Sequence, residues 1–262
     1  MIGFVADLWA LIRSEWVKVR STKAWWILMI IGAVMAGLLS LPLILVATAV
    51  DPETGEPLAE MDFTDPAALD VLWPAIGSAT VVALILGILS FTGEYRHETI
   101  TDTFLTEPRR SLVIAAKAIV NALLGGLLAL VTATVVVGVA LLLVPTPHAP
   151  FDWTQIAGTT AGAALAYGLF AIIGVALGGL ITNQIAAVVL ALLWIFVAES
   201  VISAFLPDWG PWLPGGAAAA ILGADGGWSE ALAPGPATAL LLAYAAVLAA
   251  LAGLTTLRRD IT

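Results

Sequence analysis

Six long apolar runs, nearly free of charged side chains, dominate the pattern along the 262-residue chain. A membrane-spanning helix needs about 20 consecutive apolar residues, and each run is close to or above that length. The runs are continuous and do not alternate between polar and apolar positions, which favours helices over the strands of a membrane barrel. We therefore predict an all-α integral membrane protein with six transmembrane helices, at residues 24–50, 74–92, 118–144, 155–178, 185–206 and 237–257.

Two further segments are expected to lie at the membrane without crossing it. Residues 4–20 repeat apolar side chains at helical spacing, although Glu15 interrupts the apolar arc. This pattern predicts an N-terminal amphipathic interface helix. Residues 207–236 hold only a short apolar core between Pro and Gly residues, and they predict an extracellular re-entrant element.

The composition excludes a soluble globular domain. Hydrophobic residues make up 61% of the chain and charged residues 11%, whereas soluble domains carry roughly 25% charged residues. The absence of cysteine excludes disulfides and thiolate metal sites. The two histidines, His97 and His148, are expected on opposite sides of the membrane, so no metal site is expected. The first apolar run exceeds the apolar core of a cleaved signal peptide, and we expect it to remain as a span.

The basic residues are segregated along the chain. All ten Lys and Arg residues lie before the first run, between the second and third runs, or after the sixth. The segment after the first run instead carries seven acidic residues between Asp51 and Asp70. Because basic residues accumulate in cytoplasmic loops, this distribution predicts cytoplasmic N- and C-termini, a prediction with which an even number of spans agrees.

The segment 93–117 is expected to be the one long cytoplasmic loop, and it is dense in charges of both signs. Helical spacing would place Glu94 and Glu98 on one face and Tyr95 and Thr99 on another. A short polar helix at the cytoplasmic surface is suited to docking a partner protein. A solvated loop whose arginines anchor it to the lipid also fits, so the spacing leaves both interpretations open.

Several motifs resemble those of actinobacterial ABC-2-type transporter permeases. They are SEWVKVRSTKAW at residues 14–25, GEYRHETI at residues 93–100 with TFL and PRR shortly after it, Ala116-Lys117, and the Leu213-Pro214-Gly215 turn. The two charged motifs carry the resemblance, and the shared six-span plan extends it to the whole chain.

The resemblance implies a half-transporter in a bacterial plasma membrane. It implies pairing with a second permease copy, as a homodimer or heterodimer, and with two copies of a separate ATP-binding ABC subunit. ATP and Mg would be held by that subunit, since this chain has no G-x-x-x-x-G-K-[ST] loop. We therefore expect no catalytic or cofactor-binding residue and no nucleic-acid partner, and the family implies export of a hydrophobic or amphiphilic substrate. The coupling contact with the ATPase would comprise Glu15, Glu94, Tyr95, Arg96, His97, Glu98, Thr99 and Ile100.

Glu199 is the one ionisable residue that the sequence places inside a predicted span. Such a residue is costly in lipid and is a candidate for the substrate pathway, although a hydrogen bond that packs two helices explains it equally well. Small residues at four-residue steps in the fourth span favour close helix packing, within one chain or between two copies. The glycines of that stripe are Gly158, Gly162, Gly174 and Gly178.

Two other classes of function stay open at this point. An ion-coupled secondary transporter or channel would use Glu199 and need no ATPase. A membrane scaffold or immunity protein would dock a partner through residues 93–117 without transport. The missing ATP-binding loop and the cytoplasmic motifs favour the ABC permease over both.

Overall fold

The computed structural model describes residues 2–49, 73–107, 109–143, 151–224 and 231–258, and every regular element in these ranges is helical. Six segments of the described chain are long and apolar enough to cross a membrane, which confirms the predicted all-α, six-span fold class. The elements in chain order are α1 (Ile2–Ser21), α2 (Ala24–Thr48), α3 (Trp73–Gly77), α4 (Thr80–Arg96), α5 (Ile100–Thr106), α6 (Arg110–Leu143), α7 (Trp153–Leu180), α8 (Gln184–Leu193), a π-helical turn (Trp194–Ala198), α9 (Glu199–Phe205), a 3₁₀ turn (Pro207–Trp212), α10 (Pro214–Ile221) and α11 (Pro234–Arg258).

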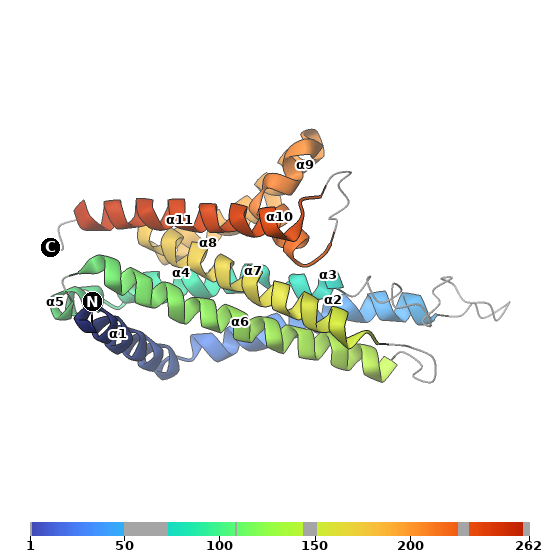
Figure 1. The fold of residues 1–262 in the computed structure, drawn as a ribbon, viewed down its shortest axis with the longest axis horizontal. Coiled ribbons are helices and arrows are strands. Elements are labelled where there is room, and N and C mark those ends of the chain that lie inside the picture. Colours follow the sequence, from blue (N-terminus) through green and yellow to red (C-terminus); the bar gives the residue numbers. More distant parts are fainter. Residues whose placement is uncertain (1, 50–72, 108, 144–150, 225–230, 259–262) are drawn as a thin grey trace.

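Helix α7 is the centre of the bundle and packs against α4, α6 and α11 (Figure 1). In its most apolar 18-residue stretch, 72% of the residues are buried, against 17% in the span from Gln184 to Phe205. The central helix is therefore covered by protein on most sides, whereas α8 and α9 present most of their apolar side chains outward.

Glycine allows α4 and α7 to approach each other at backbone distance. A Cβ atom on Gly87 of α4 would overlap the carbonyl oxygen of Ala171, and one on Gly174 of α7 would overlap that of Leu84. Lipid provides little hydrophobic force between helices, so this close approach supplies the packing energy instead.

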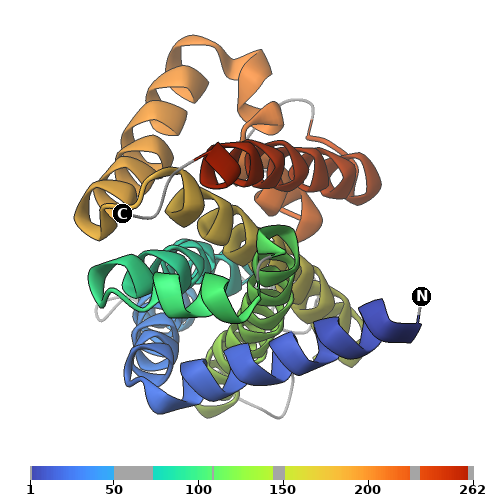
Figure 2. The same cartoon turned by 90° about the vertical axis from the view of Figure 1, so that its left-hand side faces the viewer.

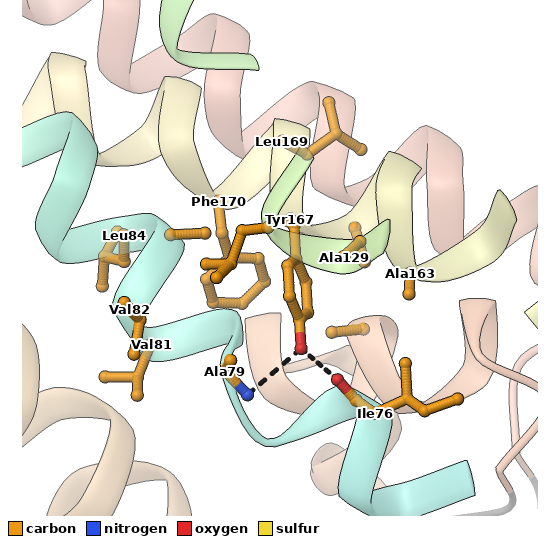
Figure 3. Close-up of a cluster of buried hydrophobic side chains, with 14 of the residues drawn as sticks. Ile76, Ala79, Val81, Val82, Leu84, Ala129, Ala163, Tyr167, Leu169 and Phe170 are labelled. Atoms are coloured by element: carbon orange, nitrogen blue, oxygen red, sulfur yellow. Dashed lines mark hydrogen bonds between the residues drawn. The ribbon is translucent and has the colours of Figure 1, made fainter. Parts of the chain in front are cut away.

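The second span is broken between α3 and α4, where the sequence predicts one continuous helix over residues 74–92. The hydroxyl of Tyr167, fully buried on α7, donates a hydrogen bond to the carbonyl oxygen of Ile76 and accepts one from the N–H of Ala79 at 3.1 Å (Figure 3). The break begins directly after Gly77, at Ser78, and such a Gly-Ser pair commonly marks helix kinks. A side chain thus satisfies backbone groups that lipid could not.

Two ends of the bundle can be distinguished. The basic end contains α1, α5 and the first turns of α6, and the far end contains α3 and α10 (Figure 1). Helix α1 runs across the basic end and crosses α6, as an interface helix would (Figure 2). Trp9 and Val17 on α1 are 69% and 61% exposed, and Arg13 and Arg20 are exposed beside them, so its outer face carries both apolar and basic side chains.

Other boundaries differ from the sequence-based expectation. Helix α6 begins at Arg110 rather than at residue 118, so the predicted loop 93–117 is mostly helical. The predicted span 185–206 is interrupted by the π-helical turn before Glu199. The acidic residues between positions 51 and 70, and residues 144–150 and 225–230, lie outside the described residues.

Candidate functional site

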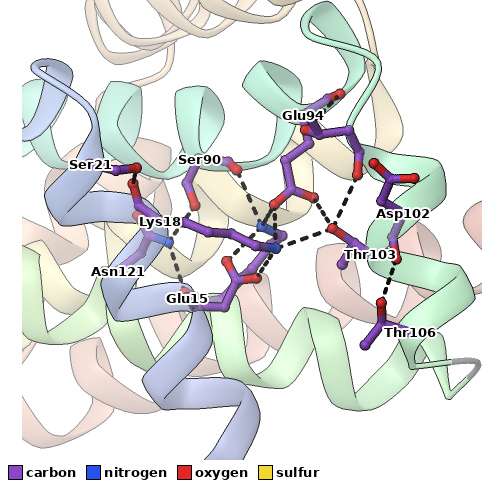
Figure 4. A network of polar contacts seen from close by, with 11 residues as sticks. Glu15, Lys18, Ser21, Ser90, Glu94, Asp102, Thr103, Thr106 and Asn121 are labelled. Carbon is purple, nitrogen blue, oxygen red and sulfur yellow. Dashed lines mark hydrogen bonds and ion pairs between the residues drawn. The ribbon is translucent and has the colours of Figure 1, made fainter.

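Lys117 of α6 is the centre of a buried ion-pair network at the basic end. Figure 4 shows its partners Glu15 and Glu94 pointing toward each other. Its side chain is 1% exposed, and its ammonium nitrogen lies 2.7 Å from Oε2 of Glu15 and 2.6 Å from Oε1 of Glu94. Both carboxylates are themselves buried. A lysine this deeply buried keeps its charge only when opposite charges surround it, and the two glutamates provide them.

Lys18 of α1 is the second cation of the network. Its ammonium lies 2.6 Å from Glu15 and 2.8 Å from Glu94, and it donates a hydrogen bond of 3.1 Å to the hydroxyl of Thr103. Burial by itself would lower the pKa of Lys18, but the attraction of Glu15 and Glu94 outweighs it, so the pKa lies above its usual value of 10.5.

The network joins four helices with balanced charge. Glu15 and Lys18 come from α1, Glu94 from the end of α4, Thr103 from α5 and Lys117 from α6. Two carboxylates and two ammonium groups cancel, which is the condition under which buried charges are tolerated. The sequence did not explain why Glu15 lies on the apolar face of α1. The structure explains it, because this position brings Glu15 into an ion pair with Lys117.

Helix α5 is a short amphipathic helix that rests on this network. Ile100 and Phe104 pack against Val113 of α6, while Asp102 is exposed and Leu105 is 78% exposed on the outer side. Arg110 stacks on the ring of Phe104 at 5.0 Å. One face of α5 is thus anchored and the other is free of the chain's own core.

The corner between α4 and α5 corrects one expectation from the sequence. Glu98 has a φ of 58°, in the left-handed region, so the helix ends before it. Glu94 and Glu98 therefore do not share a helix face. Glu94 points into the ion network, whereas Glu98 is exposed at the corner.

A second, exposed set of ion pairs ties the start of α6 to α1. Arg109 contacts Asp7 of α1 at 2.7 Å and Glu107 at 2.8 Å. The hydrogen bonds from Arg109 lower the pKa of Glu107, and those to Glu107 and Asp7 raise the pKa of Arg109. Exposed pairs of this kind contribute little to stability. Their main effect is therefore to orient the start of α6 relative to α1.

The residues expected to contact an ATPase fall into two groups. Glu15, Glu94 and Ile100 are buried within the chain and offer no surface to a partner, and Tyr95 is half-buried and stacked on Phe91. The exposed residues are Arg96, His97, Glu98 and Thr99.

The sequence-based interpretation missed Lys117 and Leu105. Lys117 is buried within the long helix α6, so Glu199 is not the one ionisable residue inside a span. The signal was available, because Lys117 directly precedes the third apolar run and the next basic residue along the chain is Arg258. Leu105 lies in the motif that carries the family resemblance, and only the fold shows that it points outward.

Glu199 lies directly after the π-helical turn, near the far end. Its Oε2 accepts a hydrogen bond of 2.9 Å from the backbone N–H of Gly215, at the start of α10. Trp194 also interacts with the carboxylate, yet the buried Oε1 accepts no hydrogen bond of normal geometry. The side chain thus links the fifth span to the short helix α10.

The four glycines of the stripe on α7 lie in different environments. Gly174 and Gly178 face α4, and Gly162 faces the backbone of Ile221 in α10. Gly158 is exposed and has no neighbour within 4 Å of the position of a Cβ atom. Three of the four glycines therefore lie at contacts within one chain.

Together these features define a multi-pass membrane protein domain, in which the N-terminal helix α1 and the short exposed helix α5 are bound to the same ion network. Residues 11–198 match the model of the ABC-2 family transporter proteins, and the chain belongs to this family. The match includes both charged motifs, which confirms the family resemblance. A comparison with curated protein sequences gives no match.

Proposed function

We propose that this chain is the permease subunit of an ATP-driven ABC exporter, with ATP bound and hydrolysed on a separate subunit. Membership of the ABC-2 family supports this proposal, since family members generally pair with ATP-binding subunits. The distribution of basic residues supports a cytoplasmic position for the basic end, where such a subunit would bind. The substrate would be hydrophobic or amphiphilic and would move outward.

The observation that carries the proposal is the two-sided character of α5. Its outer side presents Asp102 and Leu105, and its inner side is fixed by Phe104 and by the bond between Thr103 and Lys18. A force applied to the exposed side would reach α1, α4 and α6 at once through the ion network. This is the property that a coupling helix needs.

The docking surface would combine the corner and the helix. Arg96, His97, Glu98 and Thr99 would contact the ATPase together with Leu105 as an apolar anchor. Glu15, Glu94 and Ile100 would transmit the displacement from inside, because they are buried.

A second permease copy would complete the transporter. Apolar side chains from α8 to α9, among them Val189 of α8 at 47% and Phe196 of the π-helical turn at 59% exposure, have no cover within the described chain. We propose this surface for the contact between copies. Because the chain has no cysteine, Val189→Cys introduces one thiol, and an oxidative cross-link between copies in native membranes supports the contact. A cross-link equally efficient for Leu123→Cys, on the exposed side of α6, would indicate random collision.

Docking is tested by reversing charge at matched positions. Asp102→Lys and Asp208→Lys are the same substitution at exposed aspartates near the start of short helical segments, one at each end of the bundle. We expect Asp102→Lys and Leu105→Asp to abolish the Mg-ATPase activity that co-purifies with the tagged chain from native membranes, and Asp208→Lys to leave it unchanged. Equal ATPase recovery from all three variants would refute the docking surface.

The orientation is tested separately. Thr101→Cys and Trp209→Cys place single thiols at exposed positions of the two ends. In intact cells a membrane-impermeant maleimide should label only the thiol at position 209. Labelling at position 101 would invert the topology and remove the basis of the proposal.

One observation favours an alternative, the buried and incompletely bonded carboxylate of Glu199. In an ion-coupled transporter it would bind the coupling proton or cation. The purified chain alone, reconstituted in liposomes, would then accumulate substrate under an ion gradient, and Glu199→Gln would abolish this. Transport that instead requires ATP and the second subunit excludes this alternative.

A further inference from the structure

A cavity of about 570 Å³ opens at the basic end, between α1, the start of α2, α4 and α6. Ligand sites of drug-sized molecules occupy roughly 300–1,000 Å³, so the space is large enough for a ligand. The ion network around Lys117 forms one of its walls, but the coupling proposed above uses none of the space itself.

The walls change character with depth. Leu86 of α4 and Leu124 of α6 line the deep part, together with Leu28 of α2. Ser90 and Asn121 form a polar layer above them, and the ion network lies above that layer. Residues along a helix rise by about 1.5 Å each, so Asn121 lies about 6 Å deeper than Lys117. The cavity therefore runs from a charged mouth through a polar ring to an apolar floor.

The mouth carries excess positive charge. Four basic and two acidic side chains line the cavity, and Lys18 and Lys117 balance the two glutamates. The remaining cations are Lys23 and Arg96, which are exposed and pair with no carboxylate among the described residues. Arg96 makes only a 3.4 Å hydrogen bond to Gln184. An anionic group bound near Lys23 and Arg96 would compensate their two positive charges.

The polar ring contains an unused hydrogen-bond acceptor. Asn121 is 1% exposed, and its amide nitrogen donates to the carbonyl oxygen of Lys117 and to the hydroxyl of Ser90, each at 2.8 Å. Because a carbonyl oxygen can only accept, these bonds fix which amide atom is the nitrogen. The opposite atom, Oδ1, is buried and has no donor. An unpaired buried acceptor is costly, and a ligand with a hydroxyl group would satisfy it.

We infer that this cavity binds a single-chain anionic amphiphile with a free hydroxyl group, of the lysophosphatidic acid class. The phosphate would lie between Lys23 and Arg96, the glycerol hydroxyl would donate to Asn121 Oδ1, and the acyl chain would follow the leucines. A diacyl phospholipid has an ester in place of that hydroxyl and cannot donate there. The inference deepens the proposed function, because it assumes that the basic end meets the inner leaflet, but binding itself needs no ATPase.

Four probes separate the parts of this assignment. The purified full chain in maltoside micelles is titrated with 1-palmitoyl lysophosphatidic acid, and native mass spectrometry counts the bound molecules. Dipalmitoyl phosphatidic acid lacks the hydroxyl, lysophosphatidylcholine lacks the net charge, and glycerol 3-phosphate lacks the chain. We expect one bound lysophosphatidic acid per chain, with affinity about tenfold or more above each of the other three. Equal binding of any of the three would overturn the assigned ligand class.

Variants then assign each contact. The double variant Lys23→Gln with Arg96→Gln should bind lysophosphatidic acid no better than lysophosphatidylcholine. The matched control, Arg13→Gln with Arg20→Gln, removes two exposed charges of α1 that do not line the cavity and should bind as the unmodified chain does.

Asn121 is tested by the preference between two lipids. Asn121→Leu should abolish the preference for lysophosphatidic acid over phosphatidic acid. The preference for lysophosphatidic acid over lysophosphatidylcholine should remain. Asn121→Ala serves the same purpose where leucine impairs folding, as judged by the unfolding midpoint. An unchanged preference in a folded variant would overturn the role of Asn121. A chain that binds the lipid but recruits no ATPase would refute the proposed function and leave this inference standing.

Discussion

Replacing Lys117 by methionine should destabilise the protein more than any other change at the basic end. The substitution keeps the length of the side chain but removes the charge that contacts Glu15 at 2.7 Å and Glu94 at 2.6 Å. Lys18, whose side chain is 38% exposed, would then face two buried carboxylates alone. Removing one partner from a buried ion pair costs about 3–5 kcal/mol, and we expect a loss of that size.

The triple variant Glu15→Gln, Glu94→Gln, Lys117→Met is the decisive comparison. It removes the two stranded carboxylates together with the buried lysine and leaves only Lys18, whose side chain is 38% exposed, as a charge of the network. Exchange of buried ion pairs for neutral groups is often neutral or stabilising. We expect it to recover most of the loss. Unfolding is followed by tryptophan fluorescence during titration of maltoside micelles with dodecyl sulfate, since the chain has ten tryptophans.

The matched control is Lys23→Met, the same substitution at an exposed lysine that has no ion pair among the described residues. It should change stability by less than about 1 kcal/mol. A Lys117→Met protein as stable as this control, or a triple variant less stable than Lys117→Met, would refute the view that the network stabilises by charge compensation.

Three other predictions use the same unfolding assay. Tyr167→Phe should lower the free energy of unfolding by about 1–3 kcal/mol, because the buried N–H of Ala79 loses its hydrogen-bond partner. An unchanged unfolding midpoint would show that the backbone groups at the break do not depend on this hydroxyl. Glu199→Ala should be less stable than Glu199→Gln, because only glutamine keeps an acceptor for the N–H of Gly215; the reverse order would contradict this. The raised pKa of Lys18 means that its stabilising contribution is complete below about pH 10.5 and is lost as the pH rises through the folded-state value. The difference between the unmodified chain and Lys18→Met should therefore stay constant from pH 7 to about pH 10 and shrink only above it, and a difference that already falls near pH 8 would contradict the raised pKa.

The spans could be predicted because lipid imposes one requirement on all of them, a long apolar helix. Length and composition were sufficient to find six. The break before Thr80 was not predicted, because its stability comes from Tyr167, 88 residues away from Ala79 in the chain. No local pattern reports a partner at that distance.

The candidate site was predicted in part for a similar reason. The motif around Glu94 identified the segment at which α4 and α5 meet, but periodicity assumed one continuous helix and so placed Glu98 beside Glu94. The left-handed backbone at Glu98 separates them. Glu15 was noticed because it disturbs an apolar face, yet its partner Lys117 follows 102 residues later and could be found only in three dimensions.

The hydrogen bonds of the Tyr167 hydroxyl stabilise the second span as two separate helices, α3 and α4, rather than one. Helix α4 is about 25 Å long by its residue count. A tilt of α4 about the joint at Ala79 would break no backbone hydrogen bond between α4 and α3. A lever with its pivot near one membrane surface turns a small rotation at the joint into its largest displacement at the opposite surface. In this molecule the basic end lies opposite the joint, and Glu94, α5 and the cavity of about 570 Å³ meet there.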